Sequence, residues 1–293
     1  MDLRSLIILA LKISVVATVF GLGLEATFSD ATCLFRRPRE LGREMLSMNV
    51  VMPLLALGLV LAFRIHPAVK IALATLSVSP VPPIFPRQAL KAGGKHDYTV
   101  GLLAAASALA IVAIPVTLEI FQWFVGVPLR MPVRSVTDLV FLTVLAPLLA
   151  GIAVREWMPS LAERIAKPVG GAGMAFLVLS FIPVLFRSTG TILSLIGNGT
   201  LACMIAFAVV GLAAGHFLGG PDPGNRHVLA LATAVRHPGI AAAIAALNFP
   251  NQRLAVPAIL LYLIASGILA MIYRRMAARA GIAPRGTGKR VAA

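Results

Sequence analysis

The residues best suited to chemistry in this sequence lie inside apolar segments. Residues 232–249 read ATAVRHPGIAAAIAALNF, so Arg236, His237 and Pro238 interrupt a stretch of the kind that crosses a membrane. A guanidinium group presents five N–H donors in a planar fork that suits a carboxylate or a sulfate. An arginine at the centre of a membrane helix costs about 2.5–3.5 kcal/mol by insertion scales, so it persists with a partner or a function. Arg236 therefore predicts either the lining of an anion site or a structural contact to a buried acid or carbonyl.

A second interrupted segment contains four prolines. It reads SVSPVPPIFPRQA and contains Pro80, Pro82, Pro83 and Pro86, the last followed by Arg87. Each proline removes a backbone donor and clashes with the preceding turn, so a continuous helix is excluded. Unwound backbone at membrane depth is tolerated only where protein buries it or where it lines a wet cavity. We expect both segments to face inward as broken helices; the alternative is proline kinks that only shape packing. Arg87 could line the same cavity or extend to the membrane interface.

Other reactive patterns are absent from the sequence. His237 could titrate or donate to a substrate, or it could be a hydrogen-bonded structural histidine. No Ser-His-Asp arrangement, phosphate-binding loop or metal-ligand spacing occurs, and Cys33 and Cys203 have no metal-like neighbours. We therefore expect neither an enzyme, nor a metal site, nor a cofactor.

The composition indicates a membrane protein. Of the 293 residues, 59% are hydrophobic and 13% are charged, and the apolar residues form runs near the length that crosses a bilayer as a helix. The net charge of +15 does not indicate nucleic-acid binding, because the basic residues lie between apolar runs and near the C-terminus. The sequence predicts an all-α polytopic membrane protein whose partner is the lipid bilayer.

Nine candidate spans follow from the hydropathy pattern. They are residues 5–27, 46–63, 69–90, 98–124, 136–154, 170–187, 194–217, 227–248 and 254–273. The first is too long for the core of a signal peptide and lacks a convincing cleavage site, so we expect it to be retained. Because nine is odd, the two termini should face opposite sides of the membrane.

The basic residues predict the orientation. One side carries Arg36, Arg37, Arg39, Arg43, Lys91, Lys95, Arg155, Arg164, Lys167, Arg226, Arg274, Arg275, Arg279, Arg285, Lys289 and Arg290. The other side carries Arg4, Arg64, Lys70, Arg130, Arg134, Arg187 and Arg253. The richer side should be cytoplasmic, which puts the N-terminus outside and the C-terminus inside a cell (inner) membrane.

The two interrupted spans hold corresponding places, each the next-to-last span of its half. Such a pair is typical of the binding site of an inverted-repeat transporter. We expect one transmembrane domain over residues 1–273, with repeats at about 1–125 and about 135–273. Residues 274–293 would form a basic cytoplasmic tail.

Several stretches together resemble the bile acid:sodium symporter family, within the bile/arsenite/riboflavin transporter superfamily. FGLGLEATFSDATCLFRRPRE resembles that family's FGMGL span with its Arg-Pro loop, and NVVMPLLALGLVLAF resembles the core of its next span. LSVSPVPPIFP and ATAVRHPGIAAAIAA fall where the family has its two crossover segments. The resemblance implies core and panel domains, with spans three and eight crossing near mid-membrane. It also implies that the chain begins at the second of the usual ten spans.

The departures from the family bear on sodium. The resemblance places the family's sodium-ligating side chains at Met48, from Val81 to Pro86, at Ala232 and at Arg236, and of two hydroxyl ligands in span four only Ser107 remains. Hard cations need several oxygen ligands. Sodium is therefore a doubtful partner, and a fixed guanidinium at position 236 would stand about where the family has its second sodium ion.

The sequence thus predicts a secondary transporter of a small organic anion that works by alternating access. The candidate substrate-binding residues are Arg236, His237, Pro238, Arg87, Pro86, Ser107 and Asn49. The alternatives are an efflux or uniport carrier for another metabolite, or a membrane sensor or scaffold that does not transport. Arsenite export ranks low, because the first broken segment has no cysteine.

Overall fold

The computed structural model describes residues 3–126, 129–197 and 199–279. In this part of the chain every regular element is a helix, and strands are absent. The first half contains α1 (Leu3–Gly23), α2 (Phe28–Thr32), η1 (Leu34–Arg36), α3 (Pro38–Met45), η2 (Leu46–Val51), α4 (Met52–Ala62), α5 (Pro67–Val78), α6 (Phe85–Lys91) and α7 (His96–Val125). The second half contains α8 (Val133–Val140), η3 (Phe141–Leu145), α9 (Ala146–Trp157), α10 (Pro159–Ser194), α11 (Thr200–Leu218), α12 (Pro223–Ala234), α13 (Pro238–Asn248) and α14 (Ala255–Arg279).

The helices confirm a polytopic all-α membrane protein. Seven stretches of the described chain are long and apolar enough to span a membrane, and two shorter apolar helices, Leu9–Gly23 and Pro67–Val78, accompany them. Each of the nine expected spans coincides with one of these helices. The expected boundaries differ most at α10, which begins at Pro159 rather than near residue 170 and includes Arg164 and Lys167. Hydropathy marks only the part of a helix that is apolar, so a polar extension of the same helix is missed. α14 likewise continues to Arg279, and residues 280–293 of the expected tail lie outside the described residues.

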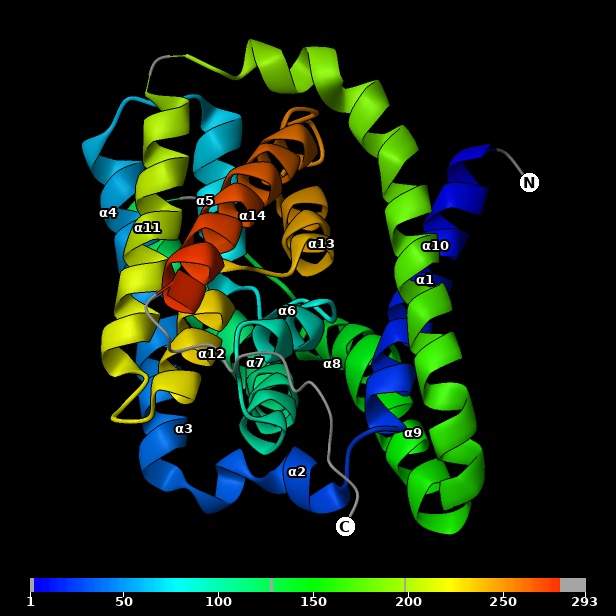
Figure 1. Ribbon diagram of the computed structural model, residues 1–293. Helices are drawn as coiled ribbons and strands as arrows, with labels where there is room; N and C mark the ends of the chain where they lie inside the picture. Colours follow the sequence, from blue (N-terminus) through cyan, green and yellow to red (C-terminus); the bar gives the residue numbers. More distant parts are fainter. Residues whose placement is uncertain (1–2, 127–128, 198, 280–293) are drawn as a thin grey trace.

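Two groups of helices make up the molecule. α1 packs along α10 and against α9, and Figure 1 shows these three helices beside the remaining bundle. The larger group contains both broken segments, with α5 packed against α13, α14 and α4, and α12 packed against α11 and α6. The grouping agrees with the panel and core that the sequence led us to expect.

Glycines set the close contact within the smaller group. A methyl group added at Gly151 of α9 would lie 2.8 Å from the Cα of Gly23 on α1, and one added at Gly21 would lie 2.8 Å from the Cα of Gly170 on α10. Membrane helices have little hydrophobic drive to associate, so small residues that let backbones approach supply much of the attraction. The smaller group is therefore held by backbone-to-backbone packing.

Two π-helical turns interrupt long helices, and each precedes a proline. η2 joins α3 to α4 ahead of Pro53, and η3 joins α8 to α9 ahead of Pro147. A proline inside a helix leaves an upstream carbonyl without its usual donor, and a π-turn shifts which carbonyl that is. Both turns therefore mark places where a backbone acceptor is available to another element.

Two ion pairs lie at one end of the bundle, one within the first half and one between the halves. Lys95 Nζ lies 2.5 Å from Asp222 Oδ2, and Arg37 Nη2 lies 3.1 Å from Asp97 Oδ2. Lys95 precedes α7, and Asp222 caps the N-terminus of α12 by accepting from the backbone N–H of Asn225. The hydrogen bond from Lys95 lowers the pKa of the Asp222 carboxyl from its ordinary value. The chain after the first broken segment is thereby tied to the start of the second.

The glycine contact gives a test of the packing. We expect Gly151→Val to lower the stability by about 1–3 kcal/mol, because the added side chain must push α1 away from α9. The measurement is the thermal unfolding midpoint of the purified protein. Gly171→Val on α10 is the matched control, since a side chain there meets nothing within 4 Å. Equal midpoints for the two variants would contradict this account of the packing.

Candidate functional site

The first broken segment lies between α5 and α6. α5 ends at Val78 and α6 begins at Phe85, so the prolines at 80, 82 and 83 occupy the break, as expected. The last turn of α5 is closed by Ser79, whose backbone N–H donates to Leu76 O and whose Oγ donates to Thr75 O at 2.7 Å. These bonds satisfy two of the carbonyls that a helix C-terminus leaves free.

The second broken segment lies between α12 and α13. α12 ends at Ala234 and α13 begins at Pro238, where the fixed φ of proline suits the first helical position. His237 is the N-cap of α13, because its Nδ1 accepts from the backbone N–H of Ile240 at 3.3 Å. Arg236 and His237 therefore lie in the break between two half-helices, and Pro238 begins the second one.

The two breaks meet. The backbone N–H of His237 donates to the carbonyl of Pro80 at 2.9 Å, which joins the unwound part of one segment to that of the other. This bond confirms the expectation of two discontinuous helices that cross in the core. We call this region the crossing, defined by residues 79–84 and 235–237.

Arg236 lies at the centre of the crossing and is 1% exposed. Its Nη2 donates to Met48 O at 2.6 Å and to Ser77 O at 2.7 Å. Both acceptors lack a helical partner for a local reason. Ser77 is in the last turn of α5, and Met48 lies in η2, where the residue five positions later is Pro53 and has no N–H to donate. Arg236 thus donates to unpaired backbone carbonyls on two different helices. Of the roles expected for this residue, this is the structural contact to a carbonyl.

Two further bonds complete the polar contacts at the crossing. Tyr262 on α14 donates its hydroxyl to Ala234 O at 2.5 Å, at the C-terminal end of α12. Ser47 and Thr233 share a hydrogen bond of 2.7 Å between η2 and α12. Sequence reasoning missed these three residues, since single hydroxyl groups in apolar helices give no pattern that separates a cap from packing.

Sequence reasoning also missed Glu44, on α3. Its side chain is fully buried, and neither carboxylate oxygen has a hydrogen-bond partner. Arg236 is held by the carbonyl of Met48, one helical turn beyond Glu44, and among the described residues Glu44 and Arg236 form no close ion pair. The available signal was an acid one turn before the apolar run of span two, which was expected to begin at residue 46. Hydropathy placed it outside the membrane, whereas the fold buries it.

The other expected site residues lie on α6, α7 and η2. Pro86 is buried in α6, and Ser107 is buried on α7 with an Oγ that has no hydrogen-bond partner. Asn49 is partly buried in η2, next to Met48. The guanidinium of Arg87 lies against Gly170 of α10, so this side chain reaches from the larger helix group to the smaller one.

Unpaired donors remain at the crossing. The Nε and Nη1 groups of Arg236 and the Nε2 of His237 are buried without partners. Because His237 Nδ1 accepts a hydrogen bond, its neutral ring carries the proton on Nε2. The region therefore offers N–H donors from two adjacent residues.

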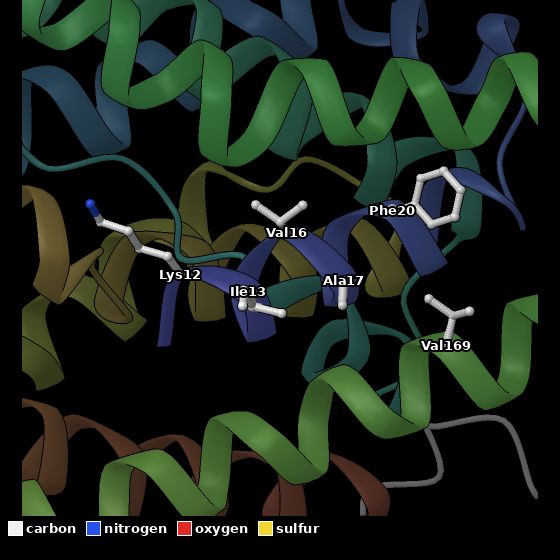
Figure 2. A pocket seen from close by; sticks show the side chains of 6 residues that line it. All are labelled: Lys12, Ile13, Val16, Ala17, Phe20 and Val169. Carbon is white, nitrogen blue, oxygen red and sulfur yellow. The ribbon is translucent and has the colours of Figure 1, made fainter. Parts of the chain in front are cut away.

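Two hollows in the protein are lined by residues outside the crossing. One, of about 330 Å³, is lined by Lys12, Ile13, Val16, Ala17, Phe20 and Val169. Figure 2 shows Lys12 at one end of this row and Phe20 and Val169 at the other, along α1 and α10. A second, of about 380 Å³, lies near the end of α7 and includes Glu119 and Arg130. Neither of these two hollows is lined by an expected substrate-binding residue. The side chain of Arg236 is 1% exposed, so the crossing is closed to solvent.

Comparison with known proteins identifies the family. The model of the sodium bile acid symporter family matches residues 12–195, which is more than half of the chain. The chain belongs to the sodium bile acid symporter family. Human sodium/bile acid cotransporter 4 is 25% identical over 246 residues, which cover 80% of this chain and 55% of that relative. This member of the symporter family thus spans about half the length of the curated relative that it matches.

The contacts of Arg236 predict a large effect on stability. Arg236→Leu should lower the free energy of unfolding by about 3 kcal/mol or more, because it removes two charge-assisted hydrogen bonds and leaves two carbonyls unpaired. The measurement is the thermal midpoint in detergent, with the exposed Arg253→Leu as control. A loss no larger than that of the control would show that the guanidinium does not hold the crossing.

Proposed function

We propose that this protein is a secondary transporter that carries a small organic anion across a cell membrane by alternating access, without sodium at the family's two sites. Its family membership and its pair of crossed, broken helices support this function. The panel of α1, α9 and α10 would move against the rest of the bundle. We take the halves at about 1–125 and about 135–273 as the inverted repeats.

The observation that carries the sodium part of the proposal is the pair of bonds from Arg236 to Met48 O and Ser77 O. In transporters with broken helices, unwound carbonyls and the C-terminal ends of half-helices coordinate the coupling cation. Here a guanidinium attached to the chain contacts such carbonyls. A tethered cation cannot be released on either side of the membrane, so it cannot couple an ion gradient to transport.

The surrounding side chains add to the case against sodium. Positions 48, 81–86 and 232 bear no side-chain oxygen, and the hydroxyls of Ser47 and Thr233 bond to each other. A sodium ion 4 Å from Arg236 would be repelled by about 4 kcal/mol at an effective dielectric of 20. That repulsion corresponds to roughly a thousandfold loss of affinity.

The anion is inferred from the unpaired donors. Arg236 Nε and Nη1 and His237 Nε2 have no partners in the closed form, and Arg87 lies where the two helix groups meet. A carboxylate or sulfate entering between the groups would supply acceptors to these N–H groups. We assign the substrate contacts to Arg236, His237, Pro238, Arg87 and Pro86, together with Ser107 and Asn49.

The alternative functions have distinct experimental outcomes. Uniport or efflux would give flux without uphill accumulation of the anion. A sensor or scaffold would give stabilisation by an anion without any flux in liposomes. A thermal-shift screen of organic anions on the purified protein supplies the ligand for both measurements.

We propose that the N-terminus faces outside and the C-terminus faces the cytoplasm. The test replaces the buried Cys33 and Cys203 by serine and adds one exposed cysteine, either Lys91→Cys or Arg134→Cys. In intact cells we expect a membrane-impermeant maleimide to label Arg134→Cys only, because the basic side is cytoplasmic. Permeabilised cells give the labelling control. Labelling of Lys91→Cys from outside would reverse the orientation.

The sodium proposal is tested by uptake into proteoliposomes with the anion found by the screen. We expect wild-type uptake to be unchanged when choline replaces sodium. Arg236→Gln should weaken uptake, and sodium should not restore it because position 232 is still alanine. Arg253→Gln is the matched control.

A double variant tests the converse. Ala232→Glu with Arg236→Gln restores the two side chains expected at these places from the family resemblance, and we expect sodium to raise its thermal midpoint but not that of the wild type. Sodium-dependent accumulation by the wild type would defeat the proposal.

A further inference from the structure

Glu44 is a buried acid to which the proposed function assigns no role. Among the residues that the structure describes it is the one buried aspartate or glutamate, with 0% exposure. Both of its carboxylate oxygens lack a hydrogen-bond partner. An ionised carboxylate in such a place costs several kcal/mol, and the usual escape is to bind a proton.

The charges on its own helix do not compensate Glu44. Glu40, one turn earlier, accepts from Arg37 at 3.5 Å at the surface. The guanidinium of Arg43 lies against Gly220, at the turn between α11 and α12. Glu44 therefore has no ion-pair partner on α3.

The neighbouring elements also leave Glu44 without a close partner. α7, which packs against α3, brings the buried Tyr98. Asp97 is engaged by Arg37, and His216 on α11 hydrogen-bonds with Tyr273. η1 contributes Arg36, which is exposed, and η2 carries no titratable side chain.

Arg236 is the fixed positive charge of the crossing. Met48, whose carbonyl accepts a hydrogen bond from Arg236, is one helical turn beyond Glu44. The Nε and Nη1 atoms of the guanidinium, which carry three N–H groups, have no hydrogen-bond partner. An unpaired buried acid on α3 thus lies one helical turn from the residue that holds the partly satisfied cation of the crossing.

We propose that Glu44 is an exchangeable proton site that couples anion transport to a proton. In the closed form the carboxyl group holds the proton. When the crossing opens to water, the O–H bond breaks, the proton passes to water on the open side, and the carboxylate remains opposite Arg236. The inference rests on the proposed function, in which the coupling cation is not sodium. One proton carried with a monovalent anion moves no net charge.

His237 is the less suitable proton carrier of this region. Its Nδ1 accepts from the N–H of Ile240 and caps α13, so protonation would break the cap as well as bury a charge. Glu44 makes no hydrogen bond that protonation would break. The geometry therefore favours the acid over the histidine as the titrating group.

The test is infrared difference spectroscopy on the purified full-length protein labelled with isotopic glutamate, in the absence of any anion. We expect a carboxylic-acid C=O band that shifts with the label and disappears as the pH rises. Glu44→Gln should remove the band, and Glu44→Asp should replace it by one insensitive to the label. Glu25→Gln, at an exposed position, is the control and should leave it unchanged. The wild-type spectrum decides the matter even where a variant fails to fold.

A variant of Arg236 provides a second test of the same infrared band. In Arg236→Gln the band should persist to higher pH, because the charge that favours the carboxylate is lost. In His237→Asn it should remain. Absence of a label-sensitive acid band in the wild type, or its survival in Glu44→Gln, would overturn the proton site.

Failure of this inference is separable from failure of the proposed function. Sodium-independent uptake without the acid band would leave the transporter proposal standing and remove the proton. The acid band together with sodium-dependent accumulation would leave the proton site standing and remove the proposal of sodium-independent transport. If both the acid band and sodium-independent uptake are observed, an inward proton gradient should accelerate uptake by the wild type but not by the Glu44→Gln variant.

Discussion

The arrangement of the core depends on one buried guanidinium. Arg236 donates to the carbonyls of Met48 and Ser77, two acceptors left free by a π-turn before Pro53 and by the end of a half-helix. Unpaired carbonyls at membrane depth would each cost several kcal/mol. One side chain therefore allows α5 to stop, α12 and α13 to cross it, and the α3–α4 helix to keep its irregular turn.

This arrangement sets a functional constraint. Carbonyls at the ends of broken helices are well suited to an exchangeable cation, and a tethered guanidinium there is held permanently. Any gradient coupling must then use a group that can exchange its ligand. Glu44 is buried and lacks hydrogen bonds, which is why we assign the proton of the proposed transport to this residue.

The helix groups differ in how they hold together. The smaller group relies on glycine contacts such as Gly23 with Gly151, where backbones touch and no side chain intervenes. The larger group relies on polar bonds at the crossing and on large apolar clusters around α5 and α14. The side chain of Arg87 contacts Gly170 and so connects the two helix groups. A movement of one group relative to the other would have to change this contact.

The sequence alone determined the class, the nine helical segments and the two breaks. These are local properties: apolar length dictates a span, and prolines together with an Arg-His-Pro-Gly run forbid a continuous helix. Only the tertiary structure decided what Arg236 contacts, because its partners are backbone carbonyls that any sequence possesses. It also decided that Glu44 is buried, since α7 and α11 pack against the helix of a residue that hydropathy assigns to the membrane surface. Burial and pairing depend on which elements pack together, and residues distant in sequence supply the charge and the cover.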